Sequence, residues 1–210
     1  MIEIFGLNPD DYVSSISLSE ECLHWIGMHI IDNDVYNIVE FGSGASTQFM
    51  IDVCEKHHLN VKIDSFDHTE NYSDLFTYDN PNYNRIIRNP IECNDESKEK
   101  MFQEQKFIRS LFNQADGKIG WRRQNIFYDI NPQADLKPIY DLAIIDGPNG
   151  NGRVFSYLML KNIMSFDSYI VLDDSLHHDF MNRFDSVFKY EIIEERKDKD
   201  KNYLIAHFIP

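Results

Sequence analysis

The sequence predicts an α/β fold in which a doubly wound sheet carries helices on both faces. Strand-like and helix-like segments alternate along most of the 210 residues, which is typical of this class. Two short runs, 142–145 and 169–172, are wholly apolar, as in central parallel strands that are buried on both faces. The third observation is a strand, a glycine turn and a helix start at 37–47, NIVEFGSGAST.

Composition places the chain among folded globular proteins, with a single domain expected over 1–210. Hydrophobic residues make up 42% and aromatic residues 13% of the sequence, enough to build a sizeable core. The 35 acidic residues outnumber the 20 basic ones and give a formal charge of −15. Because such a surface repels phosphate backbones, nucleic acid is not expected as a partner.

The sequence also predicts a cytoplasmic protein without a membrane-spanning segment. The N-terminus lacks the basic start and apolar core of a signal peptide. No apolar run in the sequence approaches the roughly 20 residues that cross a bilayer. The cysteines Cys22, Cys54 and Cys93 are widely spaced and odd in number, so we expect reduced thiols.

Periodicity predicts the elements of the N-terminal part. A helix is expected over 18–31, where apolar residues recur on one stripe, and a strand over 38–41. A second helix is expected over 45–58. A second strand over 61–66 ends just before Asp67.

The middle of the chain has a looser pattern. We expect a third strand over 84–91, a helix over 95–115 and a further strand over 121–130. The regular alternation resumes only at Tyr140, so 92–138 is predicted to be an insertion or lid. Its aromatic residues and those just before it form either a lid over a sugar or phenolic acceptor or a small satellite core. They are Tyr72, Phe76, Tyr78, Tyr83, Trp121, Phe127 and Tyr128.

The glycine turn discriminates between cofactors. A strand–Gly-x-Gly–helix turn lets a ligand approach the backbone and the N–H groups of the helix. The dinucleotide fingerprint requires Gly or Ala at its sixth position, where this chain has Thr47. Glu40 at the end of the strand would repel a pyrophosphate but attract an ammonium group, such as that of S-adenosylmethionine. Asp67 suits two ribose hydroxyls, although NAD-binding proteins carry an acid there as well.

Together, Glu40-Phe-Gly-Ser-Gly44 and Asp67 resemble the cofactor signature of class I S-adenosylmethionine-dependent methyltransferases. The resemblance covers 36–210 in strand order, and a hairpin expected from 189–193 and 203–208 fits it. It implies a Rossmann-like sheet of seven strands, six parallel and one antiparallel, with the cofactor over their carboxyl ends. The chain lacks the third glycine that many members have in the turn. The implied cofactor contacts are Glu40, Gly42, Ser43, Gly44, Ser46, Thr47, Asp67 and His68.

Carboxylates also follow the two apolar strands. Asp146 comes directly after the first, and Asp173 and Asp174 after the second. Adjacent parallel strands bring such groups to one place, where hard oxygen ligands suit Mg²⁺ or Ca²⁺. The arrangement is similar to that of catechol-type metal-dependent O-methyltransferases, which have Asp-Asn in place of Asp-Asp. The resemblance implies a magnesium site that activates a substrate hydroxyl. The alternative is that these residues cap turns and form an acidic rim.

A catalytic base is expected near the same carboxylates. His177 and His178 follow the aspartate pair and could accept a proton near neutral pH, and Asp146 is a further catalytic candidate. The segment DGPNGNGR, which ends at Arg153, resembles a turn of methyltransferase-like proteins that act on polysaccharides. Arg153 is expected to pair with an acidic substrate group or with Asp146.

These features predict an S-adenosylmethionine-dependent methyltransferase that acts on a hydroxyl of a small molecule or glycan with the help of a divalent cation. One alternative is a Rossmann-type NAD-dependent oxidoreductase, which Glu40 and Thr47 disfavour. The other is a non-catalytic binding module that retains the fold. Assembly into a homo-oligomer is compatible with the sequence, and no membrane partner is expected.

Overall fold

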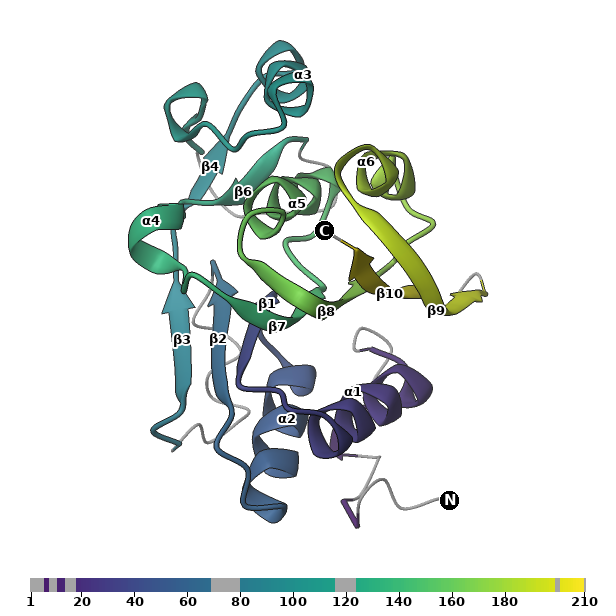
Figure 1. Ribbon diagram of the computed structural model, residues 1–210. Helices are drawn as coiled ribbons and strands as arrows, with labels where there is room; N and C mark the ends of the chain where they lie inside the picture. The colour runs from purple at the N-terminus through teal and green to yellow at the C-terminus, as the bar shows by residue number, and fades with distance from the viewer. Residues whose placement is uncertain are drawn as a thin grey trace.

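The computed structural model describes residues 6–7, 11–13, 18–68, 80–115, 124–198 and 201–209. Its centre is a seven-stranded sheet in the order β3-β2-β1-β7-β8-β10-β9 (Figure 1). Neighbouring strands are parallel except at β10, which is antiparallel to both β8 and β9. This confirms the predicted fold of six parallel strands and one antiparallel strand. The strands are β1 Asn37–Phe41, β2 Lys62–Asp67, β3 Tyr83–Ile87, β7 Tyr140–Ile145, β8 Met164–Asp173, β9 Lys189–Lys197 and β10 Asn202–Ile209.

Helices cover both faces of the sheet. Helices α1 (Glu20–Asp32) and α2 (Ala45–Lys56) lie on one side, and α5 (Phe155–Leu160) and α6 (Phe180–Val187) lie on the other (Figure 1). Alternate residues of each central strand enter two separate hydrophobic clusters, one under each helical layer. This is why the central strands read as continuous apolar runs. No helix in the described ranges is both long and apolar enough to span a bilayer.

The sheet has its topological switch point at β1. This strand lies between β2 and β7, and both neighbours run parallel to it. The connection that follows β1 leads to β2 on one side, and the connection that follows β7 leads to β8 on the other side. The turns after β1 and β7 therefore meet at the carboxyl edge. The backbone N–H of Asp146 donates to the carbonyl oxygen of Phe41 across this point (3.0 Å). Ligands of open α/β sheets bind in the crevice that such a switch point creates.

The segment between β3 and β7 differs from the prediction. The strand expected over 84–91 is divided, because β3 ends at Ile87 and β4 (Pro90–Glu92) joins a second, three-stranded antiparallel sheet, β5-β4-β6. The other two strands are β5 (Asn113–Gln114) and β6 (Ile126–Tyr128). Pro90 itself pairs with Tyr128 in this second sheet. A short helix, α4 (Pro132–Asp135), then leads to β7.

The helix expected over 95–115 is also shorter than predicted. Helix α3 (Asp95–Glu104) starts where the side chain of Asn94 accepts from the Ser97 N–H (2.8 Å). It ends at Gln105, which adopts φ 54°, a left-handed conformation that terminates helices. Beyond it, a single 3₁₀ turn at Arg109–Leu111 leads into β5.

Tertiary packing explains this early helix end. Phe107 and Phe112 stack on each other with ring centroids 5.2 Å apart, and both enter the cluster under α5 and α6. A continued helix would spread these rings along its axis. The apolar spacing that predicted one helix therefore belongs to two segments that cover the same core.

The predicted aromatic lid is only partly described. Tyr72, Phe76, Tyr78 and Trp121 lie outside the described residues. Phe127 and Tyr128 are 0% and 1% exposed in the cluster under α5 and α6. These two rings are part of the main core of that face, neither a lid nor a separate satellite core. Tyr83 is half-buried against the cluster on the opposite face.

Candidate active site at the carboxyl edge of the sheet

The two turns at the switch point are in backbone contact. Gly42 has φ 101°, a region that favours glycine, and a Cβ at this position would lie 2.8 Å from the backbone nitrogen of Gly147. A Cβ on Gly147 would lie 2.7 Å from the Cα of Gly42. Gly44 differs, because a Cβ there would meet nothing within 4 Å. The turn is thus closed on the side of β7 and open over Gly44, where α2 begins.

Glu40 is fully buried beneath this turn. Its Oε1 accepts from the hydroxyl of Ser46 (2.6 Å), and its Oε2 accepts from the hydroxyls of Thr47 and Ser65 (2.7 Å to Ser65). Burial raises the pKa of Glu40 to about 7, although the three hydroxyl hydrogen bonds oppose the rise. The side chains of Ser46 and Thr47 thus contact Glu40 and tie the first turn of α2 to β1.

The raised pKa of Glu40 makes the free energy of unfolding depend on pH. The folded pKa of about 7 lies above the ordinary value of 4.5, so the folded chain retains a proton that the unfolded chain releases between these pH values. Stability from this group is therefore complete below pH 4.5 and is lost as the pH rises to 7, by about 3 kcal/mol. We expect Glu40→Gln to remove this part of the slope in urea denaturation at pH 4.5 to 7.

The exposed Glu55→Gln is the matched control and should keep the wild-type slope. A Glu40→Gln profile parallel to that of the wild type would contradict the assignment.

Asp67 at the end of β2 contacts both the glycine turn and the residue that follows it. Its Oδ2 accepts from the hydroxyl (2.7 Å) and backbone N–H (3.2 Å) of Ser43, and its Oδ1 accepts from the backbone N–H of His68 (2.6 Å). The Nδ1 of His68 lies 3.1 Å from the same oxygen. Burial alone would raise the pKa of Asp67, but the hydrogen bonds from His68 and Ser43 outweigh it and hold that pKa below its ordinary value. Asp67 is therefore an ionised acceptor at the switch point.

Tyr128 of the second sheet reaches the same place. A Cβ on Gly147 would lie 2.5 Å from its hydroxyl, so only a glycine leaves room for the phenol. The ring stacks against that of His68, with centroids 6.4 Å apart. Burial, followed by the charge of Asp67, raises the pKa of Tyr128 well above its ordinary value. Tyr128 is thus a neutral hydroxyl beside the turn after β7 and near His68, a position that the sequence did not reveal.

The three predicted metal ligands are only partly together. The carboxyl groups of Asp146 and Asp173 lie within hydrogen-bond reach of each other. Burial raises the pKa of both, and the mutual repulsion of the carboxylates adds to the rise at Asp173. Asp174 has φ 55° and lies 3.6 Å from Arg153 and 3.4 Å from His177. The described part of the chain contains no group of three or more His, Cys, Asp or Glu side chains arranged to hold a metal ion, so the magnesium site stays a prediction.

Arg153 is the fixed cation of this cluster. It is 1% exposed, its Nη1 donates to the backbone carbonyl of Asp173 (2.8 Å), and its guanidinium lies 5.1 Å from the ring centroid of Phe180. Its ion pair is with Asp174, whereas the sequence predicted an acidic substrate group or Asp146 as the partner. A buried guanidinium here offsets charge that the three carboxylates would otherwise leave uncompensated.

The predicted histidine bases lie between β8 and α6. His177 and His178 are both exposed. His178 has φ 49°, and its ring lies 5.3 Å from that of Phe180. Burial, with the positive charges of His177 and Arg153, lowers the pKa of His178. A neutral imidazole of this kind can accept a proton at physiological pH.

Comparisons with known proteins agree with this architecture. No family model and no curated protein matches the chain. Solved structures do match. A precorrin-6Y C5,15-methyltransferase from Geobacter metallireducens has a TM-score of 0.57 at 12% identity and covers 99% of this chain and 100% of its own. A Podospora anserina methyltransferase determined with S-adenosylhomocysteine bound has a TM-score of 0.51 at 12% identity, covering 99% of this chain and 85% of its own.

A protein from Staphylococcus aureus described as a caffeoyl-CoA O-methyltransferase is similar to the same degree. Its TM-score is 0.51 at 14% identity, and the match covers 90% of this chain and 84% of the other. Identities this low establish the fold alone. The chain therefore has the Rossmann-like fold of class I S-adenosylmethionine-dependent methyltransferases.

Proposed function

We propose that this protein is a methyltransferase that transfers the methyl group of S-adenosylmethionine to a hydroxyl of a small molecule or glycan. The observation that carries the proposal is the switch point itself. There, an ionised Asp67 at the end of β2 faces a glycine turn that is open over Gly44, at the start of α2. A nucleoside fits such an edge, because the carboxylate accepts from ribose hydroxyls while the turn admits the rest of the ligand.

Ser43 supports the ribose assignment. Its hydroxyl donates a hydrogen bond to Oδ2 of Asp67 (2.7 Å). A ribose hydroxyl would donate to the same oxygen. Exchange of one hydroxyl donor for another leaves the carboxylate satisfied. His68 holds the other oxygen and keeps the side chain oriented.

Glu40 is proposed to compensate the positive charge of the methionine part of the cofactor. Its Oε1 has one hydroxyl donor, which leaves an acceptor site on that oxygen. An ammonium group nearby would keep the carboxylate ionised although burial raises the pKa of Glu40. The same carboxylate would oppose a pyrophosphate, which disfavours the NAD alternative.

Methyl transfer from a sulfonium is an in-line displacement, so the protein mainly orients the reactants and receives the proton of the acceptor hydroxyl. We assign the role of the base that accepts this proton to His178 or His177, which lie beside Asp174. Asp146 is the next candidate for this role. A divalent cation would orient and activate the acceptor oxygen. Asp146 and Asp173 fit it, because their carboxyl groups repel each other and a cation between them would offset that repulsion. Asp174 fits only after leaving Arg153 and His177.

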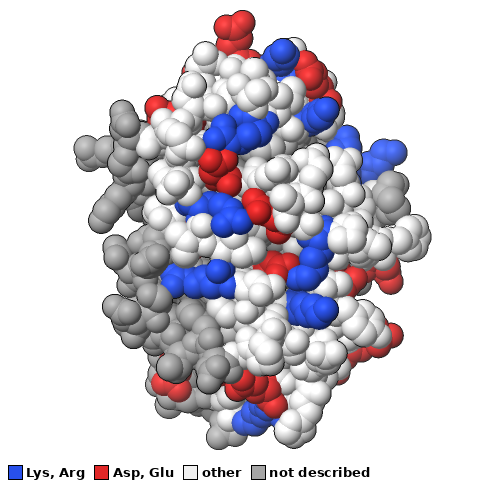
Figure 2. Space-filling view, turned by 90° about the vertical axis from the view of Figure 1, so that its left-hand side faces the viewer, with Lys and Arg blue, Asp and Glu red and all other residues white. Residues whose placement is uncertain are grey.

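The acceptor is proposed to be neither nucleic acid nor membrane lipid. On the described part of the face shown in Figure 2, Lys and Arg side chains are interspersed with Asp and Glu and form no continuous basic surface. The formal charge of −15 points in the same direction.

The first test is cofactor binding measured by titration calorimetry. We expect the chain to bind S-adenosylmethionine and S-adenosylhomocysteine, and NAD much more weakly. Asp67→Asn should weaken S-adenosylmethionine binding by ~1.5–3 kcal/mol, the range for a hydrogen bond to a charged group. Asp185→Asn is the control, because that exposed carboxylate lies on α6 and accepts from the Tyr190 hydroxyl. Preference for NAD, or unchanged affinity in Asp67→Asn, would refute the cofactor assignment.

The second arm of this test concerns the reaction. Transfer of a labelled methyl group to phenols, sugars and polysaccharides should reveal the acceptor. Cofactor binding without transfer to any acceptor would favour the non-catalytic binding module. Activity that is lost in EDTA and restored by Mg²⁺ would support the cation. Turnover that EDTA leaves unchanged would exclude it.

A further inference from the structure

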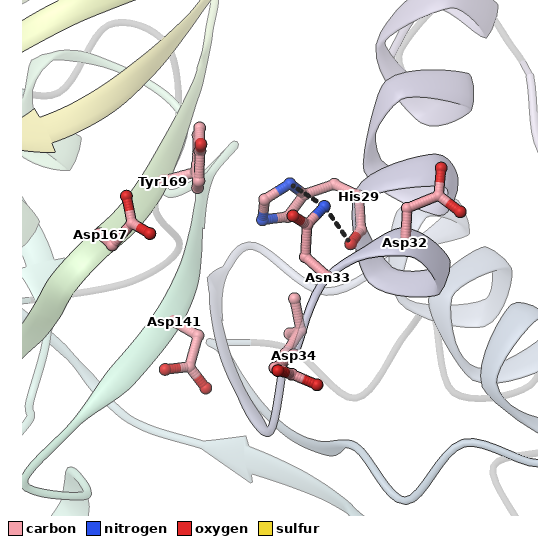
Figure 3. Close-up of a pocket in the computed structure, with 8 residues that line it drawn as sticks. His29, Asp32, Asn33, Asp34, Asp141, Asp167 and Tyr169 are labelled. Atoms are coloured by element: carbon pink, nitrogen blue, oxygen red, sulfur yellow. Dashed lines mark hydrogen bonds between the residues drawn. The ribbon is translucent and has the colours of Figure 1, made fainter.

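A pocket lies at the opposite edge of the sheet from the glycine turn. Its volume is about 340 Å³, and it opens between the end of α1 and the amino-terminal parts of β7 and β8 (Figure 3). Helix α1 and the turn after it contribute His29, Asp32 and Asp34, and the strands contribute Asp141, Asp167 and Tyr169. This size is within the range of small-molecule sites, which begins at about 300 Å³.

The charge of this pocket is uniformly negative. Four aspartates line it, and no Lys or Arg is among the lining residues. Asp141 has a role in the fold, since it accepts from the backbone N–H groups of Tyr36 and Asn37 (2.9 Å each). Asp167 contacts His207 at 2.6 Å.

Asp32 and Asp34 have no such role. Neither carboxylate has a hydrogen-bond or ion-pair partner among the described residues. They lie at and just beyond the carboxyl end of α1, where the helix dipole disfavours negative charge. The charge of these two carboxylates therefore does not stabilise the fold, whereas it would stabilise a bound cation.

His29 provides an independent indication of a ligand. It is 8% exposed, and its Nδ1 lies 3.2 Å from the side-chain nitrogen of Asn33. That amide also donates to the backbone carbonyl of His29 (3.1 Å), so Nδ1 is an acceptor and the ring proton is on Nε2. Nε2 faces the pocket and has no hydrogen-bond partner among the described residues (Figure 3). Because burial lowers the pKa of His29 to about 4, the ring is neutral and offers an N–H donor to an oxygen acceptor in the pocket.

Aromatic packing fixes this donor. Trp25 stacks on His29 with centroids 4.7 Å apart and an angle of 8° between the planes. The ring of Tyr169 lies 4.3 Å from that of His29 at 62° and 5.6 Å from that of Trp25, and it stacks on His207 at 4.9 Å. The Tyr169 ring thereby becomes a wall of the pocket, suited to C–H groups or to an ammonium group.

We propose that this pocket binds a small ammonium compound that also carries hydroxyl groups, an amino sugar or an amino alcohol. The ammonium group contacts Asp32 and Asp34. A hydroxyl oxygen accepts from Nε2 of His29, and other hydroxyls donate to Asp141 or Asp167. The site is separate from the carboxyl edge and does not depend on the methyltransferase proposal.

The test is titration of the protein with D-glucosamine at low ionic strength. We expect saturable binding that is at least tenfold tighter than that of N-acetylglucosamine, which has no positive charge. Putrescine, which carries charge without hydroxyls, should bind more weakly than glucosamine. Absence of saturable glucosamine binding, or equal binding of N-acetylglucosamine, would overturn the proposal. Tighter binding of putrescine would overturn the ligand class.

Two variants locate the binding. The double substitution Asp32→Asn with Asp34→Asn should fold normally, because neither carboxylate has a partner, and should weaken glucosamine binding at least tenfold. His29→Phe keeps the stacked ring but loses the donor, so it should weaken glucosamine binding and leave putrescine binding unchanged. Asp185→Asn combined with Glu55→Gln removes two exposed charges elsewhere and controls for the change in net charge. Undiminished glucosamine binding in the double variant would place the ligand elsewhere and overturn the proposal.

Discussion

Replacing Gly152 with alanine is expected to lower the free energy of unfolding by about 3 kcal/mol or more, at the upper end of overpacking effects. A Cβ at this position would overlap the carbonyl oxygen of Ile126 and lie 2.5 Å from its carbonyl carbon. The obstacle is backbone, so no rotamer change relieves it. Either β6 or the turn after β7 must move, and Tyr128 moves with β6. Urea denaturation followed by circular dichroism measures the change.

Gly44→Ala is the matched control. Its added Cβ meets nothing within 4 Å, and its φ of 177° is extended backbone that any residue adopts. We expect a change within about 0.5 kcal/mol. A Gly152→Ala variant as stable as Gly44→Ala would show that the second sheet does not pack against this turn as described.

The second large effect is expected at Arg153. Arg153→Met should cost about 3–5 kcal/mol, because it leaves the carboxylates of Asp146, Asp173 and Asp174 without their buried cation. The loss should be larger at pH 10 than at pH 7. Burial raises the pKa of both Asp146 and Asp173, to about 9 for Asp173, so Asp173 holds its proton below that pH and needs the guanidinium most once it ionises.

A more exposed arginine provides the comparison. Arg88 is 33% exposed at its side chain and pairs with Asp135 at 2.7 Å. Arg88→Met should cost less than about 1 kcal/mol, as for most partly exposed ion pairs, with little dependence on pH in this range. A pH-independent loss in Arg153→Met would mean that its role is limited to the hydrogen bond with the Asp173 carbonyl and to packing on Phe180.

Most of the main sheet could be predicted from the sequence, because its signals are local. The runs 142–145 and 169–172, which lie within β7 and β8, are apolar throughout since both faces of these central strands are covered. Helices α1 and α2 were predicted within two residues of their observed ends, from one apolar stripe each. The closing hairpin of β9 and β10 was also predicted, from two strand-like runs around a charged loop.

The segment between β3 and β7 was harder, because its apolar residues follow a helical spacing without forming one helix. Met101, Phe107 and Phe112 reach the same core from α3 and from the chain beyond it. Helix α6, with Phe180 and Phe184 on its buried side, was not predicted at all. Its eight residues are too few to show a clear period.

For the candidate site, the sequence determined which residues stand at the carboxyl ends of the strands. Glu40, Asp67, Asp146 and Asp173 were located from strand ends alone, because parallel strands bring their ends to one edge whatever lies between them. Only the tertiary structure decided what these residues contact. Ser46 and Thr47 contact Glu40, Ser43 contacts Asp67, and the carboxyl groups of Asp146 and Asp173 lie within hydrogen-bond reach of each other. Tyr128 and Arg153 complete the site from the second sheet and the turn after β7, since a contact between distant segments depends on how they pack and leaves no periodic trace in the sequence.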